Sequence, residues 1–418
     1  MNETTKHSIG IIRYNYLSLT LIFFYCRDFF YLVFQRVVHN EMISQVFCLL
    51  LIYGCFLICV SRNRKRIKAD AIILLLLIAM LFIFSYILNP SYRIAIIELE
   101  SWNAIDSVFT FSSGIFAYLF FRSFDDDEQL LKSLKPCAYI LLIWALFRIN
   151  SSITSGGFSR VMQNGILSQN NYDMSTGYRL LFVSLVFGLE FLKRSGIKKV
   201  WYAILAAGSA VGMLIYGSRT AAVSWVLFWV LRMLFCTSKR HDPKKVITLI
   251  AIFVMSILVT NVTFLSMVSD VLAGFGLQSR MLNTLVQQEV TLDTGRFTIW
   301  NSCLEMIKSH PFVGCGIFAD RATFGIYCHQ FFLEILIDFG CIIGGLLIVA
   351  LIWFCIKSVL TKDNSEWKLL IVLFLSLCIV RLALSSSFWM DTNYWAMLAL
   401  IVNQKEYLKK QSKFLLCC

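Results

Sequence analysis

Apolar stretches long enough to cross a bilayer recur from one end of this chain to the other. A membrane-spanning helix needs roughly 20 apolar residues, and by that measure the chain holds about twelve candidates. They cover residues 15–34, 42–60, 71–88, 104–121, 136–150, 174–192, 200–217, 221–236, 246–264, 331–356, 367–384 and 392–403. Hydrophobic residues make up 58% of the 418 residues and charged residues only 15%, unlike the composition of soluble domains. We therefore expect an all-α, polytopic membrane protein with about twelve transmembrane helices, forming one domain over residues 1–418.

The net charge of +13 gathers in the connections between these stretches. Basic clusters lie at residues 62–68, 193–199, 239–245 and 405–413. If the N-terminus is cytoplasmic and every candidate segment crosses the membrane, all four clusters fall on the same side. The positive-inside rule identifies that side as cytoplasmic. The basic charge therefore sets the orientation in the membrane and gives no reason to expect nucleic acid as a partner.

Lysine and arginine are distributed differently in this arrangement. Lys308 is the only lysine on the outer side, whereas arginines are common at the outer ends of the spans and in the outer loops: Arg148, Arg160, Arg179, Arg219, Arg280, Arg296, Arg321 and Arg381. Arginine presents a planar fork of donors that suits phosphate, while lysine is a point charge. The asymmetry predicts a phosphate-bearing partner at the outer face. Arginines that reach individually to lipid headgroups are the alternative, and they explain the asymmetry less well.

The largest outer loop, residues 265–328, is predicted to contain a helix that lies along the membrane surface. Its apolar residues recur at helical spacing: Phe297, Trp300, Leu304 and Ile307. Asp293 or Thr294 can cap the start of this helix and Pro311 stops it, after which Gly314 and Gly316 permit a turn. A loop of this length can cover a site, but it is too short for a separate domain.

Three basic side chains are predicted to converge at that outer face. Arg219 follows the seventh candidate span, Arg296 stands in the first turn of the loop helix, and His329 stands where the next span begins. Each lies near a helix N-terminus, where unpaired N–H groups and partial positive charge favour phosphate. The two arginines can therefore grip a pyrophosphate. The same dipole favours a neutral imidazole at His329, which can accept a proton.

Four further residues are weaker candidates for substrate binding. Arg160 stands in the first outer loop, while Arg280 and Arg321 flank the loop helix, so each can add a phosphate contact. Glu334 lies inside an apolar span, where an acid is costly unless it is paired. It either orients a catalytic group or pairs with an outer arginine, and the sequence leaves both open.

The fourteen cysteines do not form a metal-binding pattern, because no CxxC pair or Cys/His ligand spacing is present. We expect no metal ion and no cofactor. Cys303, Cys315 and Cys328 in the outer loop could form one disulfide, and the sequence does not decide whether they do.

Three motifs together resemble the O-antigen ligase and polymerase superfamily of bacterial envelope enzymes. The segment GSRT at residues 217–220 resembles the Ser-Arg motif of that superfamily. GRFTIW at 295–300 followed by HPFVGCG at 310–316 resembles its arginine–tryptophan helix and HPxxGxG turn. HQFFLE at 329–334 resembles its histidine motif, although Gln330 stands where the family usually has asparagine. The order and spacing of the motifs make the resemblance specific.

The resemblance implies a GT-C-like, metal-independent glycosyltransferase in the bacterial cytoplasmic membrane. Its substrates would be oligosaccharides on undecaprenyl diphosphate, as donor and as acceptor, and its protein partners could include a chain-length regulator and a flippase. Arg219 and Arg296 would bind the pyrophosphate leaving group, and His329 would activate the acceptor hydroxyl.

Three functions stay open at this point. The favoured one is a polymerase that joins lipid-linked repeat units into O-antigen, capsule or exopolysaccharide. The second is a ligase that transfers finished glycan to lipid A core or to a protein. The third is a flippase or other transporter for the same lipid-linked glycan. Transporters place their polar residues near the midplane, whereas here they gather at the outer face, which favours an enzyme.

Overall fold

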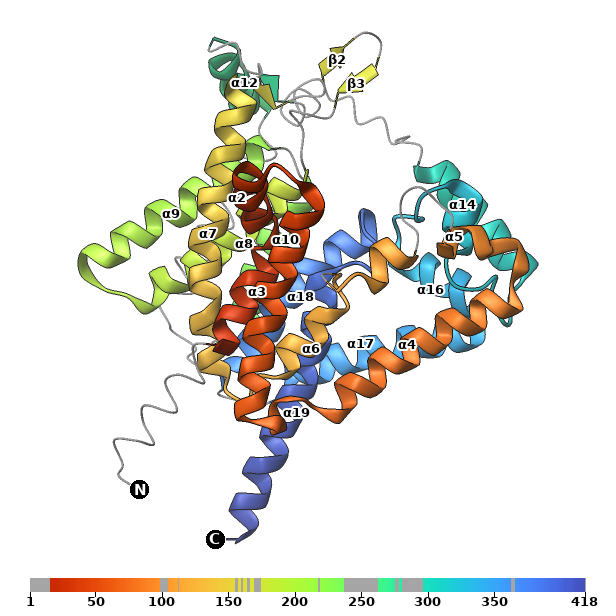
Figure 1. Ribbon diagram of the computed structural model, residues 1–418. Coiled ribbons are helices and arrows are strands. Elements are labelled where there is room, and N and C mark those ends of the chain that lie inside the picture. Colours follow the sequence, from red (N-terminus) through yellow and green to blue (C-terminus); the bar gives the residue numbers. More distant parts are fainter. Residues whose placement is uncertain are drawn as a thin grey trace. The chain divides into compact units, whose positions relative to one another are not determined.

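The computed structural model of the chain is shown in Figure 1. It describes residues 16–97, 104–111, 113–154, 157–158, 161–163, 166–168, 174–216, 219–236, 262–274, 278–279, 296–361 and 365–417. The chain divides into two compact units, Met1–Ser133 together with Asp293–Cys418, and Leu134–Leu292.

Seven helices within the described residues are long and apolar enough to cross a membrane. They are Glu41–Arg62 (α3), Ala69–Leu88 (α4), Asp127–Thr154 (α7), Met174–Lys193 (α8), Gly196–Ile215 (α9), Phe331–Leu360 (α16, η4 and α17) and Glu366–Leu384 (α18). The helices Tyr16–Tyr25 and Arg27–Val38 (α2) are bent by 78° and add an eighth span if the pair is counted as one. The chain is therefore a polytopic membrane protein built mainly of helices.

Four expected spans are not among these. Residues 392–403 begin the helix Thr392–Cys417 (α19), which is not one of the seven. Residues 104–121 are not one helix but the π-helix Ile105–Phe109 (η3) followed by the short helix Phe116–Arg122 (α6). The break lies at Gly114, where a side chain would clash with the backbone of Met390. Residues 221–236 form Arg219–Phe235 (α10), which is shorter than a full span. The expected span 246–264 lies almost entirely outside the described residues, as only its end belongs to α12.

The first unit contains the N-terminal helices and the whole C-terminal part of the chain. Its remaining elements are the short helices Arg64–Arg66 (η1), Pro90–Tyr92 (η2), Arg93–Ile97 (α5) and Ala319–Phe324 (α15), the helices Arg296–Ser309 (α14) and Thr392–Cys417 (α19), and the π-helix Gly340–Gly344 (η4), which joins Phe331–Phe339 (α16) to Gly345–Leu360 (α17). α18 and α19 pack along each other, and α6 packs against α19.

The second unit is built on the close pair α8 and α9, against which α10 packs. It also contains Val262–Gly274 (α12) and four short strands. Gly157–Phe158 (β1) pairs in parallel with Gln278–Ser279 (β4), and Val161–Gln163 (β2) pairs antiparallel with Ile166–Ser168 (β3). These two small ladders are the exceptions to the predicted all-α fold.

A buried arginine joins three helices of the first unit. Arg122 at the end of α6 is only 2% exposed. Its Nε donates to Asp70 across 2.8 Å, one Nη donates to Asn403 across 2.6 Å, and the other pairs with Glu406. The first turn of α4, the end of α6 and the middle of α19 are thereby held together.

Candidate functional site

The turn HPFVGCG fixes the loop to the span that follows it. The N–H of Cys315 donates to Ile337 O across 2.7 Å, and the N–H of Cys341 donates to Pro311 O across 2.7 Å. Gly314 has φ +80°, and a Cβ built on it would lie 2.5 Å from the Gly340 nitrogen. Only glycine allows both this conformation and this close backbone contact. The predicted turn at the two glycines of this motif is confirmed.

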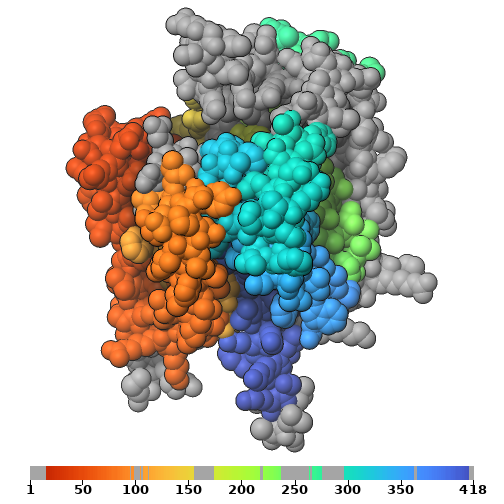
Figure 2. Space-filling view, turned by 90° about the vertical axis from the view of Figure 1, so that its right-hand side faces the viewer, coloured from red at the N-terminus to blue at the C-terminus, as the bar shows by residue number. Residues whose placement is uncertain are grey.

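The same turn also contacts the neighbouring span α4. The N–H of Ile317 donates to Ser85 Oγ across 3.0 Å, and a side chain at Gly316 would clash with Asn89. Figure 2 shows this proximity, with the teal and cyan segment around residues 300–330 beside the orange segment of α4. The loop is therefore held by backbone contacts on two sides.

The predicted loop helix is present as α14, Arg296–Ser309, and it ends before Pro311 as expected. Its buried face differs from the predicted stripe. Cys303 and Ile307 are buried in a cluster with Ile299 and Met306, whereas Phe297 and Leu304 are 46% and 44% exposed. Ile307 thus belongs both to the predicted stripe and to the buried face, while the position of this helix along the membrane surface stays a prediction.

His329 lies in the short connection between α15 and α16 with an unusual backbone. Its φ is 59°, the left-handed region that residues with a side chain seldom adopt. Its ring lies 4.3 Å from the ring of Tyr327 and is hydrogen-bonded to the backbone of Ser385. Trp300 on α14 donates its indole N–H to the carbonyl of the preceding residue, Cys328, across 3.0 Å.

The surroundings of His329 keep its imidazole neutral. Burial lowers the pKa of His329, and the positive charge of Arg296 lowers it further. A backbone hydrogen bond with Ser385 acts in the opposite direction and raises this pKa. Nδ1 is buried and has no hydrogen-bond partner among the described residues. A neutral imidazole keeps one nitrogen that can accept a proton.

The structure brings Arg296 and His329 into one neighbourhood of the first unit, since the positive charge of Arg296 lowers the pKa of His329. Arg219 begins α10 in the second unit, and its side chain is outside the described part of the structure. Its convergence with the other two residues therefore stays a prediction. Arg160 and Arg280 lie outside the described residues, and their proposed substrate contacts also stay predictions.

Arg321 and Glu334 lie beside His329 but are enclosed in the protein. Both are at most 1% exposed, and Arg321 Nη2 lies 3.1 Å from Glu334 Oε1. Arg321 also donates to Ser387 Oγ across 2.7 Å and pairs with Asp320 across 3.2 Å. The pairing with an arginine of the loop, one of the two alternatives left open for Glu334, is present in the structure.

Gln330 serves as the N-cap of α16. Its side-chain oxygen accepts the N–H of Leu333 across 2.6 Å, which satisfies one of the free donors at the helix start. Asparagine, the family's usual residue, is also a good N-cap. The substitution is therefore compatible with the same local backbone immediately after His329.

Several residues at the site are absent from the sequence-based prediction. Asp320, Tyr327 and the backbone of Ser385 all contact the segment that carries His329 or its ring. The tyrosine two residues before the histidine was the one available signal. Asp320 and Ser385 carry no pattern that separates them from ordinary loop residues.

The cysteines of the loop are reduced. Cys303, Cys315 and Cys328 are all buried with free thiols, so none of the three is in a disulfide. In the part of the chain that the structure describes, no group of three or more His, Cys, Asp or Glu side chains is placed to hold a metal ion.

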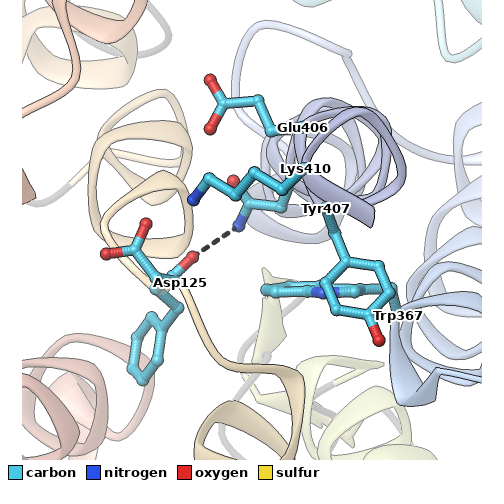
Figure 3. A pocket seen from close by; sticks show the side chains of 7 residues that line it. Asp125, Trp367, Glu406, Tyr407 and Lys410 are labelled. Carbon is cyan, nitrogen blue, oxygen red and sulfur yellow. Dashed lines mark hydrogen bonds between the residues drawn. The ribbon is translucent and has the colours of Figure 1, made fainter. Parts of the chain in front are cut away.

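A small pocket lies far from this neighbourhood (Figure 3). It is lined by Phe124, Asp125, Trp367, Asn403, Glu406, Tyr407 and Lys410. Trp367 is at the start of α18, whereas Ser385 caps its end, so the two are separated by the helix length of about 28 Å. None of the predicted site residues lines this pocket, and we assign it no part in the chemistry.

A multi-pass helical membrane protein with a neutral histidine beside an arginine is the class that the fold and the site define. Within that class, residues 200–349 match the family model described as O-antigen ligase, and this match supports the O-antigen ligase/polymerase superfamily. The matched segment includes Arg219, Arg296 and His329. Members of the family are glycosyltransferase-like enzymes that act as ligases or polymerases. Neither the curated proteins nor the solved structures contain a match to this chain.

Proposed function

We propose that this protein is a polymerase that joins oligosaccharide repeat units carried on undecaprenyl diphosphate, at the outer face of the bacterial cytoplasmic membrane. The observation that carries the proposal is the partly buried imidazole of His329, whose pKa is lowered by burial and by the positive charge of Arg296. A neutral imidazole next to a guanidinium suits a reaction that removes a proton from a hydroxyl and expels a diphosphate.

The proposed reaction is a single displacement at the anomeric carbon of the donor glycan. The neutral imidazole of His329 takes the proton of the acceptor sugar hydroxyl while that oxygen forms a bond to the anomeric carbon. The bond from this carbon to the diphosphate oxygen breaks, and the electron pair leaves with undecaprenyl diphosphate. Arg296 and Arg219 stabilise the negative charge that develops on the leaving group. The proposed reaction uses only these side chains and requires no metal ion. For the whole chain we propose a GT-C-like fold.

The length of the loop supports polymerisation over transfer to a protein. The segment between α12 and α16 holds one helix of moderate length, α14, and the short α15 among its described residues. Protein-directed relatives are expected to carry a larger additional domain. Ligation to lipid A core is the second candidate, because the matched family model is described as O-antigen ligase.

The test uses purified protein in lipid nanodiscs with lipid-linked repeat units as the sole substrate. A polymerase lengthens the glycan and releases undecaprenyl diphosphate with no other acceptor present. A ligase is inactive until lipid A core is added. His329→Ala and Arg296→Ala are expected to lower the rate by at least about 100-fold, the size of a lost general base or charge-stabilising group. Full chain growth by His329→Ala would contradict the proposal.

A further inference from the structure

The residue before His329 is anchored by a buried carboxylate. Asp320 is fully buried, and its Oδ2 accepts the N–H of Cys328 across 2.9 Å. Its Oδ1 accepts the N–H of Arg321 across 2.8 Å. The next residue, His329, has the left-handed φ of 59°, which requires its surroundings to hold it. Asp320 therefore fixes the backbone from which the imidazole projects.

Arg321 connects Asp320 to Glu334 and to Ser387. Its Nη1 lies 3.2 Å from Asp320 Oδ1, and its Nη2 lies 3.1 Å from Glu334 Oε1. The same Nη2 donates to Ser387 Oγ across 2.7 Å. Because the guanidinium is a rigid plane, these contacts fix the distance between α15, α16 and the segment after α18.

The segment held in this way is the one that binds the ring of His329. Ser387 Oγ donates to Glu334 Oε1 across 2.5 Å, and the N–H of Phe388 donates to Glu334 Oε2 across 3.2 Å. Two residues earlier, the backbone of Ser385 is hydrogen-bonded to the ring of His329. The backbone and the ring of the histidine are thus both held by one connected set of buried charges.

Arg321 has no access to an external phosphate. Its side chain is 0% exposed, and its guanidinium carbon lies 3.6 Å from the centre of the Phe318 ring. Two carboxylates already face its charge, Asp320 and Glu334. A diphosphate would have to displace buried carboxylates to reach it.

Resting on the glycosyl transfer proposed above, we propose that Asp320, Arg321 and Glu334 are positioning residues for His329. They hold the imidazole in position for the acceptor hydroxyl and do not bind the lipid diphosphate. This replaces the substrate-binding role expected for Arg321 and Glu334 from the sequence.

The first variants to measure are Asp320→Asn and Arg321→Lys. Asparagine keeps an oxygen for the N–H of Cys328 but loses the charge that faces Arg321. Lysine keeps the charge but cannot reach Asp320, Glu334 and Ser387 with one planar group. We expect kcat for chain growth to fall by at least 10-fold while KM for the lipid-linked substrate changes less than 2-fold.

Arg122→Lys is the matched control, since Arg122 is also a buried arginine of the first unit that faces two carboxylates, far along the chain from His329. Its thermal midpoint should fall as that of Arg321→Lys does, with kcat unchanged. Ser387→Ala removes a single hydroxyl and is the milder variant if either charged variant does not fold. It should lower kcat by about 3-fold with KM unchanged, as expected for the loss of one modest hydrogen bond.

Affinity for undecaprenyl diphosphate alone, measured by native mass spectrometry, provides a readout separate from turnover. Unchanged affinity in Arg321→Lys supports the positioning role. Affinity reduced 10-fold or more with kcat retained would make Arg321 a diphosphate ligand and overturn the inference. An active His329→Gln variant would defeat the proposed reaction itself. An inactive His329→Gln, together with wild-type kcat in Asp320→Asn, Arg321→Lys and Ser387→Ala, would defeat only the positioning role.

Discussion

Trp300 donates its indole N–H to the carbonyl oxygen of Cys328 across 3.0 Å. This bond joins the first turns of α14, which begins at Arg296, to the residue immediately before His329. The arginine and the histidine come from different segments of the chain, so their separation depends on contacts of this kind. The Trp300–Cys328 bond is therefore one physical link between the segments that carry the two proposed catalytic groups.

Replacing Trp300 by phenylalanine is expected to remove this link while keeping an aromatic ring. The loss of one partly buried hydrogen bond should cost about 1 kcal/mol of unfolding free energy. It should also lower the rate of chain growth by about 10-fold, because small displacements of reacting groups are costly. Thermal midpoint and kcat in nanodiscs measure the two effects. Trp353→Phe, at an exposed position of α17, is the control, and an equal loss of kcat there would contradict the assignment.

The rate of the reaction should respond to pH through His329. Its pKa lies below the ordinary value because of burial and Arg296, so the base stays neutral at neutral pH. Activity should therefore persist as the pH falls through about 6.5 and decline only below it. Arg296→Met removes a neighbouring positive charge, which raises the pKa and moves the acid limb of kcat to higher pH.

Arg296→Lys keeps the positive charge and is the control for this shift. Its acid limb should stay where that of the wild type lies, even if its kcat is lower. An acid limb that does not move in Arg296→Met would show that His329 is not the group that titrates. Rates for both variants would be measured from pH 5 to 8, the range in which histidine titrates, and each set would be normalised to its own maximum.

Gly314→Ala should be among the most damaging small substitutions in the chain. The added methyl would meet the Gly340 nitrogen at 2.5 Å, and the position has φ +80°. We expect a loss of about 3 kcal/mol or more, combining overpacking with backbone strain. Size-exclusion profiles and thermal midpoints in detergent would measure it. Gly54→Ala, where no atom lies within 4 Å of the added carbon, should match the wild type.

Arg122→Met tests the ion network at the other end of the first unit. Asp70 and Glu406 would each lose a charged partner, but both are 42% exposed and regain water. The cost should therefore be about 2 kcal/mol, less than the 3–5 kcal/mol of a fully buried pair. KM should be unchanged. Lys132→Met, in an exposed pair with Glu128, should stay within about 0.5 kcal/mol of the wild type.

The sequence was sufficient for features that depend on local patterns. The end of the loop helix before Pro311 and the turn at Gly314 followed from backbone chemistry alone, and the structure has both. The long apolar runs gave seven or eight of the expected spans among the described residues. The span expected at 104–121 was wrong because its break at Gly114 is set by a contact with Met390, which is distant in sequence.

The site shows the same division between local and distant information. That an acid at position 334 needs a partner followed from its apolar surroundings, but the identity of Arg321 as that partner required the fold. The burial of Arg321 also could not be foreseen, because an arginine in a polar loop is most often exposed. Whether Arg219 joins Arg296 and His329 depends on the arrangement of the two units and stays a prediction.

The left-handed backbone of His329 implies a conflict between the proposed catalysis and the thermal stability of the fold. A side chain at such a position costs roughly 1–2 kcal/mol, and glycine would not carry this cost. A His329→Gly protein should therefore survive heating better than the native protein, even though it would lose the proposed polymerisation. Such a gain would mean that the enzyme tolerates a weakened fold at this one residue in return for a base aimed at its substrate.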